Sequence, residues 1–96
     1  MKRSAALEKN RERIRKIVLA HLASNPRVFG SVLHGDDTEL SDLDILIDPA
    51  HDASLLDIAN IQVELGALLG VSIDVLTPTA LPPRLRTQVV QEAQAI

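Results

Sequence analysis

Three aspartates of the 96-residue chain lie where carboxylates could hold a metal ion. Asp42 and Asp44 are both part of Ser41-Asp42-Leu43-Asp44, at the start of a predicted strand. Because side chains alternate along a strand, the two carboxylates share one face and Leu43 occupies the other. Adjacent carboxylates repel each other unless a cation lies between them, and Mg²⁺ prefers oxygen ligands. A turn-forming aspartate followed by an exposed strand residue would give the same pattern.

The third aspartate, Asp74, interrupts the apolar segment 71–76, which predicts a further strand. Alternation places Asp74 on the face opposite Ile73 and Val75, which would point to the core. If this strand lies beside the one before it, Asp74 converges with the other two carboxylates. An ordinary solvent-facing strand position is the competing interpretation.

A glycine–serine pair, Gly30 and Ser31, directly follows a predicted strand at 27–29. Glycine lets the backbone approach a ligand closely, and a serine hydroxyl with nearby N–H groups can hold phosphate oxygens. Taken alone, the pair also fits a plain junction between a strand and a turn. Its significance depends on the aspartates that follow it.

Taken together, Gly30-Ser31, ten intervening residues and Asp42-Leu43-Asp44 resemble the signature of the DNA polymerase beta-type nucleotidyltransferase superfamily. More narrowly, the chain is similar to the minimal nucleotidyltransferases, the antitoxin partners of HEPN-domain toxins. Asp74, thirty residues after Asp44, matches the third carboxylate of that family. Many relatives carry an arginine before the second glycine of the loop. Here His34 precedes Gly35, and histidine is a weaker, pH-dependent phosphate partner.

The resemblance implies Mg²⁺-dependent transfer of AMP from ATP, with two metal ions. Asp42 and Asp44 would hold Mg²⁺ against the triphosphate, and Asp74 would bind the second ion and help to deprotonate the attacking hydroxyl. The acceptor implied is a tyrosine hydroxyl of a HEPN toxin, which AMP would silence, as in type VII antitoxins. Four residues are predicted to bind the nucleotide: Gly30, Ser31, Gly35 and Ser41.

Other functions remain open at this point. The same fold could neutralise a HEPN toxin by binding alone, with a vestigial site. Transfer to a small molecule such as an aminoglycoside is a further alternative, although those relatives usually carry an added helical domain. A metal-binding domain without transfer activity is the last.

The elements that must position these residues follow from hydrophobic periodicity and from turn residues. Their order predicts an α/β (α+β) fold, a small mixed sheet with helices packed on one side, as in the polymerase beta-like nucleotidyltransferases. Asn25-Pro26 is expected to end the first helix, Asp52 or Ser54 to cap the second, and Gly70 to stop it. The predicted segments are a helix at 4–23, strands at 27–29, 43–47 and 71–76, a helix ending near 69, and a last helix from Leu81-Pro82-Pro83 with Leu85, Val89, Ala93 and Ile96 on one stripe.

Length and composition limit the remaining possibilities. Ninety-six residues suit one domain, residues 1–96, and the absence of cysteine excludes disulfides and thiolate metal sites. Without an apolar segment that could cross a bilayer, we expect a cytoplasmic protein with no membrane contact. Residues 1–16 hold seven of the ten Lys and Arg, whereas 36–57 hold eight carboxylates. That acidity and the single aromatic residue, Phe29, argue against direct nucleic-acid binding.

Overall fold

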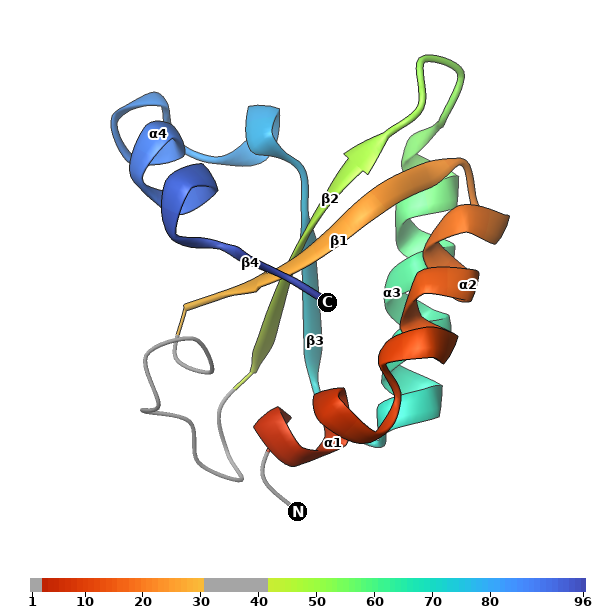
Figure 1. The fold of residues 1–96 in the computed structure, drawn as a ribbon. Helices are drawn as coiled ribbons and strands as arrows, with labels where there is room; N and C mark the ends of the chain where they lie inside the picture. The colour runs from red at the N-terminus through yellow and green to blue at the C-terminus, as the bar shows by residue number, and fades with distance from the viewer. Residues whose placement is uncertain (1–2, 31–41) are drawn as a thin grey trace.

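A computed structural model describes residues 3–30 and 42–96 of the chain (Figure 1). The helices are α1 (Arg3–Lys9), α2 (Arg11–Ala20), α3 (Leu55–Leu69) and α4 (Pro83–Glu92), with a short 3₁₀ helix η1 (Pro78–Ala80). The strands are β1 (Ala23–Phe29), β2 (Leu43–Pro49), β3 (Ile73–Leu76) and β4 (Gln94–Ala95).

The strands form one mixed sheet in the order β3-β2-β1-β4. β1 runs antiparallel to both β2 and β4, whereas β2 and β3 are parallel. A parallel pair needs a crossover, and α3 supplies it between β2 and β3. The predicted fold class, an α+β fold with a small mixed sheet and helices, is confirmed. The expectation that all helices pack on one side is wrong, because η1 and α4 lie across the sheet from α2 and α3.

One face of the sheet packs on α2 and α3, which lie together on the same side in Figure 1. Both helices present apolar side chains at helical spacing to the strands, and this burial is the main source of stability. The predicted core face of β2 is confirmed, because Leu43, Ile45 and Ile47 are fully buried. From the helices, the buried side chains are Ile14, Val18, Ile61, Leu65 and Leu69.

The opposite face carries the polar side chains of β2, but part of it is covered as well. Leu46 points away from the α2–α3 core and is still fully buried. The chain returns to this face through η1 and α4, which lie across the sheet from α2 and α3 (Figure 1), and Leu81 between them is buried. Among the described residues, η1 and α4 leave open the end of this face at which β2 begins.

The first predicted helix is two helices with a break at Asn10. The Asn10 side chain donates a hydrogen bond to the Ala6 carbonyl, which offers the backbone an alternative to continuing the helix. The expected stop at Asn25-Pro26 is wrong, because α2 ends at Ala20 and both residues lie inside β1. There the pairing with β2 is irregular, as expected where proline enters a strand.

The ends of α3 agree with the sequence. Ser54 and Asp57 form a reciprocal capping box, and Gly70 closes the helix in the left-handed conformation with φ of 66°. The last predicted stripe is interrupted, since α4 ends at Glu92 and Ile96 lies beyond it, buried after the short β4. In the described ranges, 3–30 and 42–96, no helix combines the length and the apolar character needed to cross a membrane.

Candidate functional site

The pairing of β2 with β3 brings two of the predicted aspartates side by side. Asp44 and Asp74 are direct partners in the parallel register, on the face opposite the α2–α3 core. The start of this pair is fixed by the Leu43 N–H, which donates to the Ser72 carbonyl at 2.9 Å. Asp42 precedes β2 and, by alternation, lies on the same side as Asp44. Asp42 and Asp74 are exposed, whereas Asp44 is half-buried.

The electrostatics of Asp44 show that the three carboxylates interact. Burial raises the pKa of Asp44 above its ordinary value, and the negative charges of Asp74 and then of Asp42 raise it further. Among the residues that the structure describes, no lysine or arginine forms an ion pair with any of the three. Their mutual repulsion is therefore not offset by a protein cation in that part of the chain.

The carboxylates interact without forming a closed cage. Across residues 3–30 and 42–96, no three acidic or histidine side chains stand close enough to enclose a metal ion. Mg²⁺ does not require such a cage, because it keeps waters and usually takes only one or two carboxylates plus substrate phosphates. The neighbouring oxygens of Asp44 and Asp74, in a field that favours positive charge, fit that donor set.

Gly30, at the end of β1, lies directly against Asp44. Its φ is 78°, and a Cβ added there would stand 2.4 Å from Oδ2 of Asp44. The register explains the contact, since Phe29 pairs with Asp44 across the β1–β2 ladder. The sequence predicted that this glycine lets the backbone approach a ligand. Leaving aside its two neighbours in the chain, the described group that a Cβ at Gly30 would meet is the Asp44 carboxylate, so Gly30 sets where that carboxylate can lie.

The other predicted nucleotide-binding residues, Ser31, Gly35 and Ser41, lie outside the described residues, as does His34. Their assignment to phosphate binding stays a prediction.

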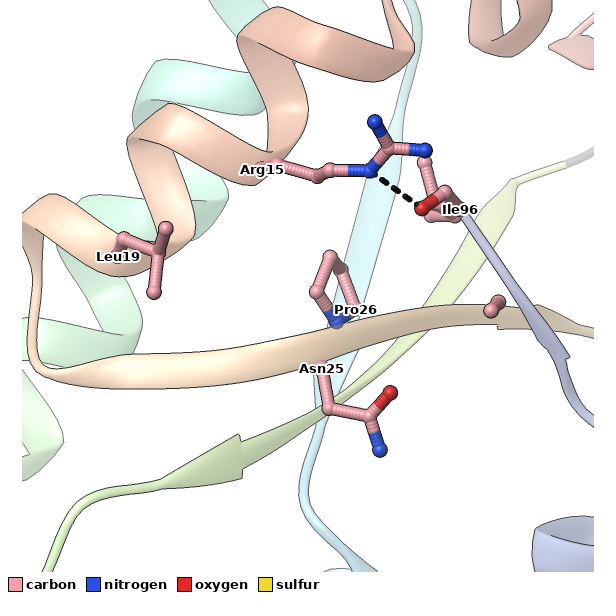
Figure 2. A pocket seen from close by; sticks show the side chains of 6 residues that line it. Arg15, Leu19, Asn25, Pro26 and Ile96 are labelled. Atoms are coloured by element: carbon pink, nitrogen blue, oxygen red, sulfur yellow. Dashed lines mark hydrogen bonds between the residues drawn. The ribbon is translucent and has the colours of Figure 1, made fainter.

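Two neighbouring features are separate from the carboxylates. Further along the carboxylate face, Arg27 donates to Asp48 at 2.5 Å, and with 11% of its side chain exposed it is committed to that partner. A groove of about 260 Å³ lies between α2, β1 and the segment after α4 (Figure 2). None of the predicted site residues lines it, and Arg15 spans it to the Ile96 carbonyl at 2.7 Å.

Comparison with known proteins decides the family. The model of the nucleotidyltransferase domain matches residues 8–96. This chain belongs to the nucleotidyltransferase domain family. Within that family it resembles short members: a solved structure of a predicted minimal nucleotidyltransferase is 40% identical, with a TM-score of 0.84 over 97% of this chain and 93% of that one. The predicted resemblance to minimal nucleotidyltransferases is confirmed.

Two archaeal relatives indicate the branch of this nucleotidyltransferase. A predicted protein adenylyltransferase of Methanocaldococcus jannaschii is 35% identical over 83 residues, which cover 86% of this chain and 89% of the relative. The protein adenylyltransferase MntA of Thermococcus cleftensis is 37% identical over 65 residues, 68% of this chain and 66% of the relative. This nucleotidyltransferase is therefore homologous to protein adenylyltransferases.

A more distant structure shares the fold of this nucleotidyltransferase. It is a toxin–antitoxin crystallised with AMP-PNP, 22% identical, with a TM-score of 0.74 over 90% of this chain and 71% of that one.

One contact near the carboxylates involves a residue to which sequence reasoning assigned no role. Gln62 of α3 accepts a hydrogen bond from the N–H of Val75, the residue after Asp74. A glutamine on a helix is usually a solvated surface residue, so no signal in the sequence separates it from the others.

Proposed function

We propose that this nucleotidyltransferase transfers AMP from ATP to a tyrosine hydroxyl of a HEPN-class toxin and so acts as its antitoxin. The observation that carries the proposal is the pairing of Asp44 with Asp74 on the sheet face opposite α2 and α3. The relatives named as protein adenylyltransferases support a protein acceptor. The toxin–antitoxin of the same fold supports a toxin as partner, and AMP-PNP, an analogue of ATP, supports the donor.

In this mechanism Asp42 and Asp44 would hold Mg²⁺, and Asp74 would hold a second ion. Bound Mg²⁺ would neutralise the charge that develops on the phosphate oxygens. Gly30 leaves the Asp44 carboxylate the space it needs to face the nucleotide. The loop residues Ser31 and Gly35 are proposed to hold the phosphates beyond the α-phosphorus.

The proposed transfer forms one P–O bond and breaks another, and the residues named above hold the phosphates and accept the proton. The acceptor oxygen attacks the α-phosphorus, a P–O bond forms, and the bond to the bridging oxygen breaks as pyrophosphate leaves. Asp74, exposed beside Asp44, takes the proton of the hydroxyl. An exposed carboxylate suits this step because the acceptor must reach it from outside the chain.

The surface of the helices supports a protein as acceptor. Several large apolar side chains near the end of α2 and on α3 are exposed rather than packed, among them Leu55 at 85% and Leu56 at 69%. Leu19 and Val63 are exposed at 64% and 69%. Exposed apolar side chains of this size can contribute to a contact with a protein partner.

Neutralisation by binding alone is the second candidate. It is favoured by His34, which stands where many relatives carry an arginine and is a weaker, pH-dependent phosphate partner. In that case the toxin would be inactive in the complex without covalent change.

The test is the intact mass of the partner toxin after incubation with this chain, ATP and Mg²⁺. The proposal predicts the mass of one or more AMP groups on the toxin, mapped to a tyrosine by peptide sequencing. The Asp42→Asn/Asp44→Asn double variant should still bind the toxin and leave its mass unchanged. An unmodified but silenced toxin would favour neutralisation by binding, and modification by the double variant would contradict the metal assignment.

A further inference from the structure

The strand that carries Asp74 is an edge of the sheet formed by the described strands. Within residues 3–30 and 42–96, β3 has β2 on one side only, so half of its backbone groups have no strand partner there. The Ser72 carbonyl accepts from Leu43 of β2, so by alternation the groups of Asp74 also face β2. The N–H of Val75 therefore faces away from the sheet, at its open edge.

A side chain of α3 completes this edge. Oε1 of Gln62 accepts from the Val75 N–H at 3.1 Å, in a partly buried position. α3 is a firm support for that contact because Ile61 and Leu65, on either side of Gln62 in sequence, are fully buried in the core. The contact thus ties the backbone next to Asp74 to a packed helix rather than to solvent.

We infer that Gln62 is a positioning residue for Asp74, an inference that rests on the proposed function. β3 is only four residues long, so few other hydrogen bonds fix its backbone. A strand this short can shift or fray at an open edge, and that movement would carry the Asp74 carboxylate away from Asp44.

A purely structural role is the competing explanation, since covering an edge strand also prevents pairing with other chains. The structural and the positioning role predict different effects when the hydrogen bond between Val75 and Gln62 is removed. A structural role costs stability alone. A positioning role also weakens binding of the metal–nucleotide pair, because groups that orient metal ligands typically affect affinity by roughly 10–100-fold.

Three variants separate the roles. Gln62→Met keeps the length of the side chain and removes the acceptor, whereas Gln62→Glu keeps an acceptor oxygen. Ser54→Ala removes the cap at the far end of the same helix and is the control for lost stability, at about 1 kcal/mol. The hydrogen bonds of the Ser54 side chain are with Asp57, not with β3 or the three predicted site aspartates.

The first measurement is calorimetric titration of each full-length variant with Mg²⁺ and AMP-PNP, which involves no transfer. The inference predicts at least about tenfold weaker binding for Gln62→Met than for Ser54→Ala, and near wild-type binding for Gln62→Glu. Equal affinity of Gln62→Met and Ser54→Ala would overturn it.

The second measurement is hydrogen exchange of the Val75 amide by NMR, without metal or nucleotide. Exchange should be faster in Gln62→Met than in Ser54→Ala and close to wild type in Gln62→Glu. Unchanged Val75 exchange in Gln62→Met would overturn the inference independently. If the wild type binds Mg²⁺ and AMP-PNP but never modifies a toxin, the proposed function fails while these binding comparisons still decide the role of Gln62.

Discussion

Replacing Gly30 with alanine should disable the site far more than it destabilises the fold. Two costs arise at this position. The first is the backbone, because φ of 78° lies in the region that residues with a Cβ rarely adopt, at about 1–2 kcal/mol. The second is steric, because the new Cβ would stand 2.4 Å from Oδ2 of Asp44.

The steric cost can be worked into an effect on transfer. Ordinary contact begins at 3.4 Å, so the Asp44 carboxylate must withdraw by the difference, 3.4 − 2.4 = 1.0 Å. A displacement of about 1 Å at a reacting centre can cost about a hundredfold in rate. We therefore expect transfer to fall by about that factor, with a stability loss of only about 1–2 kcal/mol.

Gly70→Ala is the matched control. Gly70 also has a positive φ, 66°, but nothing lies within 4 Å of a Cβ placed there. It should therefore lose similar stability in urea denaturation and keep wild-type transfer of AMP to the toxin and wild-type titration with Mg²⁺ and AMP-PNP. If Gly30→Ala retains full transfer, or if both variants lose it equally, the claim that Gly30 sets the position of Asp44 is refuted.

Four further outcomes are expected. Asp44→Asn should lower transfer at least about a hundredfold and yet raise the thermal midpoint at neutral pH, since it removes one of three repelling charges. The folded-state pKa of Asp44 is raised above its unfolded value, so the ionised carboxylate destabilises the wild-type protein above the folded pKa. The gain in thermal midpoint of Asp44→Asn over wild type should therefore shrink as the pH falls through that pKa. Arg27→Ala should lose about 1–2 kcal/mol in urea denaturation, because it breaks a 2.5 Å contact with Asp48. Ser54→Ala should lose about 1 kcal/mol and leave transfer unchanged, as the same denaturation and transfer assays would show.

Local patterns in the sequence predicted the parts of the fold that depend on local physics. Alternation in β2 correctly separated Leu43, Ile45 and Ile47 from the aspartates. Helix-end chemistry correctly located Gly70 and narrowed the cap to Asp52 or Ser54, of which Ser54 is the cap, because capping involves residues within one turn of each other.

The features of the fold that the sequence did not predict depend on competition between local and distant contacts. The break at Asn10 depends on one side chain taking the Ala6 carbonyl. The two-residue β4 forms only because β1 offers it an edge, a contact that no local pattern encodes. Alternation places Leu46 on the face opposite the α2–α3 core, where it is nevertheless fully buried.

The candidate site shows the same division. Periodicity put Asp42 and Asp44 on one face and Asp74 on the outer face of its own strand. Whether these faces meet depends on which strands are neighbours, and the sequence does not say. The β2–β3 register answers the question by pairing Asp44 with Asp74. The close approach of Gly30 to Asp44 and the hydrogen bond from Val75 to Gln62 are both tertiary contacts. A glycine or a glutamine in the sequence does not by itself predict them.

The most direct test of the aspartate assignment is a crystal structure of this chain with Mn²⁺ in place of Mg²⁺ and with AMP-PNP, phased to locate the anomalous signal of the metal. We predict metal ions bound by Asp42, Asp44 and Asp74 between the carboxylates and the triphosphate. A metal bound elsewhere on the chain, or a nucleotide bound with Asp74 turned away from it, would contradict the mechanism.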